Sequence, residues 1–319
     1  MTASLPADVQ DVFARFITTE YTTIDRGGHP ITWPVTPYYQ RGAGAIDLST
    51  GAGYPKKALD AKRNQRVALL FSDATGSGME GAPMVLVQGT AKVDDADFDA
   101  NRRRYDREVA VKLPAAEETA PPDFLKRFFL WYYARLYVYV RPERVFVWPE
   151  GDIAAEPQLH GTHLEEVRSG HVEEPEEGPP EPEGGAEAWD ERMDELGDRY
   201  PAAVLTFVAP DGFPFSARVP ISVDRAAHRI RIGAVPVGAP MLPGLACVTA
   251  HDHDEAFRWQ RNFQVRGDLV QEDGEWSLVP HRLVGGLELP PVSTFQRYRM
   301  NFAKIRRFRR TAKRVMAGR

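Results

Sequence analysis

The chain has 319 residues, of which 43% are hydrophobic and 27% charged, the balance of an ordinary globular protein. This length allows two domains of about 150 residues, each able to bury its own core. Cys247 is the single cysteine, which excludes an intrachain disulfide, and the sequence has neither an apolar run of about 18 residues nor an N-terminal signal pattern. We therefore expect a cytoplasmic protein and exclude disulfide scaffolds and membrane-spanning chains.

The net charge of −5 conceals a strong asymmetry along the chain. Residues 295–319 contain ten Lys or Arg and no acid, whereas the rest contains 30 basic and 45 acidic residues. Apolar side chains recur there every three or four positions, which predicts a basic amphipathic helix (Phe295, Tyr298, Phe302, Ile305, Phe308). We expect this helix to dock on its own acidic protein, with anionic membranes or nucleic acid as alternative partners.

The first 148 residues alternate short β-rich runs with turn signals and a few helical stretches. Strands are predicted at 21–24, 31–39, 45–48, 67–73, 84–93, 136–140 and 144–148. Helices are predicted at 7–18, 55–63, 95–111 and 123–134. Strands joined by hairpins, with helices added at the edges, indicate a small antiparallel barrel.

The run from Ile31 to Tyr39 contains Pro34 and Pro37, which cannot donate to a β-ladder. Neighbouring backbone groups are then free to pair with the edges of a planar ligand, flanked by Trp33, Thr36 or Tyr38. The alternative is an edge strand that its prolines protect from aggregation.

The loop between the strand at 45–48 and the helix at 55–63 is typical of a phosphate site. It contains two hydroxyls, two glycines and two lysines in succession (Ser49, Thr50, Gly51, Gly53, Lys56, Lys57). Cations at a helix start are disfavoured by the helix dipole, so the paired lysines indicate a bound anion. No Gly-Lys-Ser/Thr is present, which favours a monophosphate over a nucleoside triphosphate. A solvated basic helix start is the alternative.

A Glu- and Pro-rich segment, 149–187, separates two stretches that resemble each other. Gly28, Pro30 and Val35 correspond to positions 184 residues later, and the run at 87–93 corresponds to that at 265–270 with an offset of 178. We therefore expect a first β domain at 1–148, a linker at 149–187, a degenerate second β domain at 188–290 and a basic helix at 291–319. The second copy has neither lysine nor hydroxyl across 232–244, so we expect it to bind no phosphate.

Three stretches of the first domain, residues 23–37, 46–50 and 57–70, resemble the pyridoxamine 5′-phosphate oxidase-like split β-barrel family, also called flavin/deazaflavin oxidoreductases. The resemblance covers roughly residues 7 to 148. It implies a mainly β fold of two tandem split β-barrels, the second degenerate, followed by a C-terminal amphipathic helix. Members bind FMN or the deazaflavin coenzyme F420 at a dimer interface, and some bind haem.

Applied to the matching positions of this sequence, the resemblance implies that Ser49, Thr50 and Lys57 hold the cofactor phosphate and that Lys56 assists. The backbone of the segment Trp33, Pro34, Val35 and Thr36 meets the ring. Because this strand lacks the arginines of true pyridoxamine phosphate oxidases, the resemblance implies hydride transfer with another small organic substrate. The alternative is a carrier that binds flavin, deazaflavin or haem without turnover. The two barrels are expected to form a pseudo-dimer within the chain, or the chain a homodimer.

No acid or base is assigned to catalysis, although Tyr38, Tyr39 and Tyr54 are candidate proton donors. No metal site is expected. His251 and His253 could form half of one, but a third ligand is missing and a surface turn is the preferred interpretation. His29 is expected to be solvent-exposed in a turn, with haem ligation as the alternative.

Overall fold

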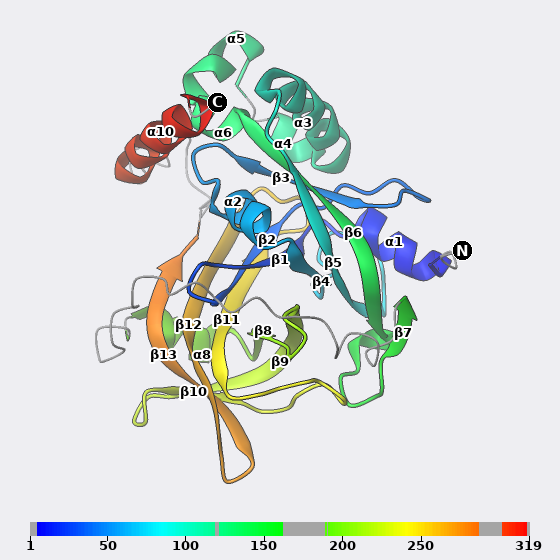
Figure 1. Ribbon diagram of the computed structural model, residues 1–319, viewed down its shortest axis with the longest axis vertical. Coiled ribbons are helices and arrows are strands. Elements are labelled where there is room, and N and C mark those ends of the chain that lie inside the picture. Colours follow the sequence, from blue (N-terminus) through cyan, green and yellow to red (C-terminus); the bar gives the residue numbers. More distant parts are fainter. Residues whose placement is uncertain (1–4, 119–120, 162–188, 190, 287–301, 318–319) are drawn as a thin grey trace.

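The computed structural model describes residues 5–118, 121–161, 189, 191–286 and 302–317. The protein is mainly β, with two β units one above the other and helices at the edges (Figure 1). The C-terminal helix α10 (Phe302–Ala317) lies at the far end of the first unit. The predicted fold class, two β-barrel units and a terminal helix, is confirmed.

The first unit is an antiparallel sheet in the order β2-β1-β4-β5-β6-β3, with β7 paired to β6. Its strands are β1 (Thr19–Ile24), β2 (Pro30–Val35), β3 (Ile46–Gly51), β4 (Arg66–Phe71), β5 (Met84–Asp94), β6 (Arg135–Trp148) and β7 (Gln158–Gly161). The two end strands, β2 and β3, are not paired, although an isolated bridge joins Tyr38, three residues beyond β2, to Asp47 of β3. The unit is therefore a barrel left open along one side.

Helices cover the ends and edges of this open barrel. They are α1 (Ala7–Arg15), α2 (Lys56–Arg63), α3 (Phe98–Lys112), α4 (Pro114–Glu118), α5 (Asp123–Lys126), η1 (Arg127–Phe129) and α6 (Leu130–Tyr133). In α1 the apolar residues Val9, Val12 and Phe13 recur at helical spacing and are all buried in the first core. The start of α3 is capped by Asp97, whose carboxylate accepts from two backbone N–H groups of the first turn.

The second unit is a closed barrel in the order β10-β13-β12-β11-β8-β9. It follows η2 (Pro149–Gly151) and α8 (Glu191–Arg199) and consists of β8 (Ala202–Val208), β9 (Pro214–Asp224), β10 (Arg229–Ile232), β11 (Gly244–His253), β12 (Gln260–Glu272) and β13 (Glu275–Gly285). This strand order repeats that of the first unit, element for element in chain order.

A shared irregularity strengthens this correspondence. The register shifts at Gly89 between β5 and β6 and at Gly267 between β12 and β13, and each glycine faces a proline, Pro142 or Pro280. A Cβ at these glycines would lie only 2.2 Å and 2.0 Å from the carbonyl oxygens of the facing strands. Only glycine therefore fits either bulge.

Four hydroxyls meet where the two units pack together, and we call Thr22, Thr32, Thr206 and Ser216 the hydroxyl quartet. Within each unit the pair lies 2.9 Å apart, in Thr22–Thr32 and in Thr206–Ser216. Across the units Thr22 lies 3.3 Å from Ser216, and Thr32 lies 3.0 Å from Thr206. Thr206 and Ser216 follow Thr22 and Thr32 by 184 positions. An operation that exchanges the two units therefore turns the Thr22–Ser216 contact into the Thr206–Thr32 contact, as the two-fold axis of an isologous dimer does.

Several predicted elements differ in detail from the structure. The predicted closing pair of strands is one continuous strand, β6, and the predicted helix at 123–134 is three short pieces. The predicted strand at 31–39 ends at Val35, before Pro37. In the segment expected as a linker, β7 pairs with β6, while 162–188 lies outside the described residues.

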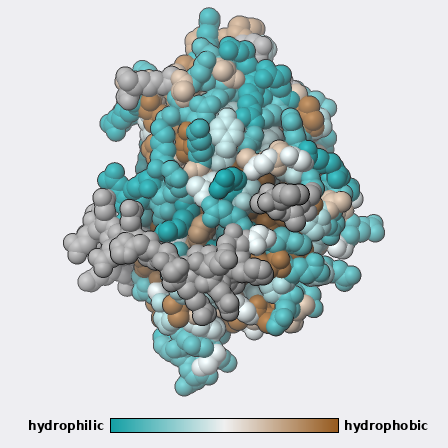
Figure 2. All heavy atoms as spheres, turned by 45° about the vertical axis from the view of Figure 1, so that its right-hand side comes forward, coloured by the Kyte–Doolittle hydropathy of each residue, from teal (hydrophilic) through white to brown (hydrophobic). Residues whose placement is uncertain are grey.

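Figure 2 shows one face of the molecule, which is largely hydrophilic with apolar side chains in small groups. Among the residues that the structure describes, no helix is long and apolar enough to cross a membrane.

Candidate functional site

The loop after β3 packs against α6 rather than opening toward a ligand. A Cβ on Gly51 or Gly53 would lie 2.8 Å or 2.7 Å from the carbonyl oxygen of Trp131. The N–H groups of Ala52 and Gly53 donate to the carbonyls of Ala134 and Trp131. These glycines therefore allow close packing of the backbone against α6.

The predicted phosphate residues divide into two groups. Lys56 is exposed and pairs with Asp60 at 3.0 Å and Asp25 at 3.5 Å, so carboxylates already offset its charge at the helix start. The Thr50 hydroxyl donates to the Tyr54 carbonyl at 3.1 Å and closes the loop. Ser49 and Lys57 instead lie close to the guanidinium of Arg135.

Lys57 is half-buried, with its ammonium group 5.6 Å from the centre of the Tyr54 ring. Burial, followed by the nearby charge of Arg135, lowers its pKa to about 8. No carboxylate pairs with Lys57 in the described parts of the chain.

Arg135, the first residue of β6, lies opposite Gly51 in the register with β3 and is buried. Its guanidinium donates to the Ser49 hydroxyl at 2.9 Å, to the Ser49 carbonyl at 3.1 Å and to the Tyr132 carbonyl at 3.1 Å. It lies 4.0 Å from the centre of the Tyr105 ring, and its Nε is buried without a hydrogen-bond partner. All these partners are neutral, and sequence reasoning did not identify this arginine.

We call Ser49, Tyr54, Lys57 and Arg135 the cationic site. Burying a cation without a counter-charge is costly, and two neighbouring cations also repel each other. The unused Nε of Arg135 and the unpaired ammonium group of Lys57 fit a bound anion such as a phosphate. The site could therefore hold the phosphate of a cofactor.

The tyrosines around this site do not form a proton donor suited to neutral pH. Burial raises the pKa values of Tyr38, Tyr105 and Tyr132, which keeps their hydroxyls neutral. Tyr39 lies elsewhere, donating to Gln10 of α1 at 3.1 Å. Of the candidate donors, Tyr54 lies nearest the charges, with its hydroxyl 3.3 Å from an Arg135 nitrogen.

The segment from Trp33 to Thr36, predicted to meet the cofactor ring, is half-exposed along the open edge of β2. Next to it, the Thr32 carbonyl accepts from Gln264 of the second barrel at 2.7 Å. The second barrel thus covers part of this edge. In the described parts of the chain, no hydrogen bond joins this segment to the cationic site.

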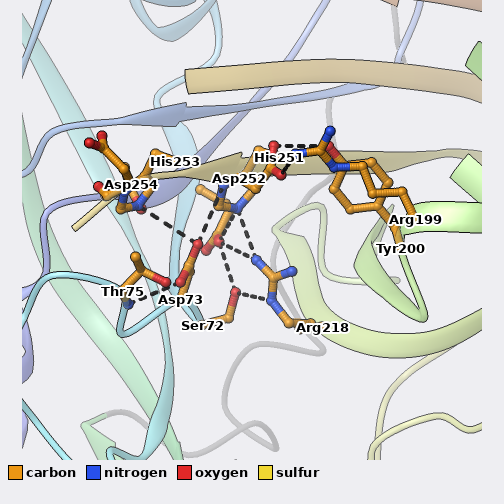
Figure 3. Close-up of polar contacts among 12 residues, drawn as sticks. Ser72, Asp73, Thr75, Arg199, Tyr200, Arg218, His251, Asp252, His253 and Asp254 are labelled. Carbon is orange, nitrogen blue, oxygen red and sulfur yellow. Dashed lines mark hydrogen bonds and ion pairs between the residues drawn. The ribbon is translucent and has the colours of Figure 1, made fainter. Parts of the chain in front are cut away.

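A second polar cluster lies between the barrels, and we call its members the interbarrel cluster (Glu20, Ser72, Asp73, Arg218, His251, His253). Figure 3 labels all of them except Glu20. His251 Nε2 lies 2.6 Å from a carboxylate oxygen of Glu20, which also accepts from Arg218 at 3.1 Å and Ser72 at 2.8 Å. Asp73 lies 3.9 Å from His251 and 3.7 Å from His253.

The prediction that His251 and His253 lie in a surface turn is wrong. His251 and His253 are both buried, on the side of β11 that faces the first unit. Burial alone would raise the pKa of Glu20, but the hydrogen bond and charge of His251 and the charge of Arg218 lower it overall. The described His, Cys, Asp and Glu side chains form no group suited to a metal ion. The cluster therefore acts as a buried ion network that joins the barrels.

His29 also departs from its prediction, because it is buried rather than exposed. Its ring lies 6.5 Å from that of His281 on β13. The side chain contributes to packing between the units.

Comparison with known proteins gives distant structural matches. No family model matches the chain, and no curated protein matches it. A conserved hypothetical protein of Mycobacterium tuberculosis matches at 20% identity over 47% of this chain and 87% of its own, with a TM-score of 0.35. A Clostridium acetobutylicum protein related to general stress protein 26, of the pyridoxinephosphate oxidase family, matches at 12% identity over 50% and 94%, with a TM-score of 0.33. A FAD-binding protein of Mesorhizobium loti matches at 16% identity over 46% and 93%, with a TM-score of 0.30. Each match spans about half of this chain, and we draw no functional conclusion from them.

Proposed function

We propose that this protein is a cytoplasmic flavin- or deazaflavin-dependent oxidoreductase that transfers hydride to or from a small organic substrate. The observation that carries the proposal is the cationic site, where the half-buried Lys57 lies close enough to the buried Arg135 for the two charges to repel, and neither pairs with a carboxylate of the described residues. FMN and F420 both carry a phosphate group that would supply the missing negative charge.

In this proposal the residues of the chain bind and orient the cofactor. Lys57 and Arg135 pair with the phosphate, and the Ser49 hydroxyl, already bonded to Arg135, fixes the direction of the guanidinium. The segment from Trp33 to Thr36 would contact the ring, as the family resemblance implies. When bound, the flavin or deazaflavin supplies the hydride chemistry, and the protein supplies position and exclusion of water.

The second candidate is a carrier that binds the cofactor without turnover. It is favoured by the tyrosines around the cationic site, whose raised pKa values make them poor acids at neutral pH. Haem is a weaker candidate ligand, since His29, the histidine considered for its iron, is buried against His281.

Titration with FMN and riboflavin tests the phosphate assignment, because the two differ only in the phosphate. We expect FMN to bind at least tenfold more tightly, and equal affinities would contradict the role of the cationic site. F420 is titrated in parallel. Absorption and fluorescence of the purified protein identify a retained cofactor, and reoxidation of the reduced complex by added substrates distinguishes an enzyme from a carrier.

A further inference from the structure

The helix α10 presents a row of exposed cations. Ile305 and Ala312 are buried in the first core, and Phe308 stacks on Trp131 with ring centres 5.5 Å apart. The described apolar side chains of the helix thus pack within the molecule. Its other face carries six exposed cations (Arg306, Arg307, Arg309, Arg310, Lys313, Arg314).

These cations have no acidic partner among the described residues. Arg309 donates to the backbone carbonyl of Phe128 at 3.2 Å, and the side chains of the others form neither an ion pair nor a hydrogen bond with described residues. Six like charges within nine consecutive residues of one helix repel one another, at a cost that an opposing surface of negative charge would relieve. The expected docking of the helix on its own protein holds, but the docking uses the apolar face and leaves the cations facing outward.

Exposed apolar side chains lie beside this row of cations. The Arg309 bond places Phe128 next to α10, and Phe128, Phe124 and Leu130 are 54%, 64% and 40% exposed. The guanidinium of Arg127 stacks on the Phe128 ring at 4.9 Å. In Figure 1, α5, α6 and α10 lie together at one end of the molecule. We call α10 and these three side chains the basic end.

We propose that the basic end binds the surface of an anionic phospholipid membrane. Arginines and a lysine would lie at the headgroup phosphates, while Phe124, Phe128 and Leu130 would enter the boundary between headgroups and acyl chains. Exposed apolar side chains among the cations favour a lipid surface over a nucleic acid. The rest of the chain is acidic, so electrostatic attraction orients the molecule with this end toward the membrane.

Sedimentation of the full chain with vesicles tests the proposal. We expect binding to vesicles of phosphatidylcholine with 30% phosphatidylglycerol, little binding to phosphatidylcholine alone, and release by salt at about 0.5 M. The variant R306Q/R310Q/K313Q should bind roughly 100-fold more weakly. Its matched control, R225Q/R229Q/R231Q, loses the same charge from β10 and the turn that precedes it, at the opposite end of the molecule, and should bind as the wild type.

A second variant tests the apolar contribution. F124S/F128S replaces two exposed rings, so folding should persist, whereas vesicle binding should fall at least fivefold and become more sensitive to salt. An equal loss of binding in both charge variants would show non-specific attraction and overturn the proposal. Tight binding to a DNA or RNA 20-mer without binding to anionic vesicles would overturn it in favour of nucleic acid.

Discussion

Arg135 donates to both the hydroxyl and the carbonyl oxygen of Ser49, at 2.9 Å and 3.1 Å, which fixes a buried guanidinium on neutral groups alone. Lys57 is the second cation at this place, and its lowered pKa reflects burial and the Arg135 charge.

Replacing Lys57 with Ala should weaken FMN binding by about 1.5–3 kcal/mol, the range for hydrogen bonds to charged groups. Calorimetry measures the change. Lys56→Ala is the matched control: it removes a neighbouring lysine that pairs with Asp60 and Asp25, so binding should change little. Riboflavin affinity should not respond to either substitution, and a loss of FMN affinity only in the Lys56 variant would reverse the assignment.

The affinity for FMN should fall as pH rises through about 8, the pKa of Lys57 in the free protein, because the neutral amine no longer attracts the phosphate. Fluorescence titrations from pH 7 to 9.5 should show up to about a tenfold loss. Lys57→Ala should start from a weaker affinity and lack this decline.

Rising pH has the opposite effect on the stability of the folded protein: through Lys57 it weakens FMN binding but stabilises the fold. Since the folded pKa lies below the ordinary value of 10.5, the unfolded chain binds the proton more readily, and the free energy of unfolding without cofactor should rise between about pH 8 and 10.5 from this group.

The interbarrel cluster should make the protein sensitive to acid. The pKa values of Glu20 and Asp73 are lowered in the folded state, so their stabilisation is present above their ordinary values of 4.5 and 3.8 and is lost as pH falls through the folded values. Glu20→Gln leaves His251 and Arg218 without their shared carboxylate, which should cost about 3–5 kcal/mol at pH 7. Urea unfolding at several pH values should show a flatter acid dependence in this variant.

Ile305→Ala should destabilise the protein by about 2–5 kcal/mol, because the side chain is buried in the first core beneath α10. Arg306→Ala, one residue further on, removes an exposed side chain and should change the free energy of unfolding by less than about 0.5 kcal/mol. Thermal unfolding compares the two. Equal melting temperatures for Ile305→Ala and wild type would show that the helix is not docked in solution.

The two-unit architecture could be predicted from the sequence because the residues that mark the repeat meet local backbone requirements. Gly28 and Gly212 both adopt positive φ in hairpin turns, and Gly89 and Gly267 both form bulges that admit no Cβ. Such backbone requirements restrict the residue type wherever the fold repeats, so the offsets of 184 and 178 marked matching strands.

The cationic site was accessible only in part. Ser49 and Lys57 belong to one continuous loop and helix, but Arg135 arrives through the pairing of β3 with a strand more than 80 residues later. The aromatic run around it, from Trp131 to Tyr137, was the available signal. His251 and His253 were misjudged because their burial comes from the first unit packing on β11, which no local pattern records.

The correspondence between units predicts one cofactor per chain. Pro142 and Pro280 occupy matching positions in β6 and β13, and the residues seven positions before them are Arg135 and Asp273. Val140 and Leu278 also occupy matching positions, and they pair with Ile46 and Ile230. Three residues after these partners, the first unit has Ser49 and the second has Gly233. In the second unit the position that corresponds to Arg135 lies in the turn between β12 and β13 and holds the exposed Asp273, and the position that corresponds to Ser49 holds a glycine without a hydroxyl.

Titration of the full chain with FMN should accordingly saturate near one equivalent. Arg135→Met should abolish this binding rather than halve it, since no second site would remain, whereas Arg266→Met, the buried arginine beside the matching bulge of the second unit, should leave the stoichiometry at one. Saturation near two equivalents, or half of the capacity persisting in Arg135→Met, would show that the second barrel binds a cofactor of its own. One equivalent per chain, lost entirely with Arg135, would mean that the second barrel contributes its packing surface to the first and no site of its own.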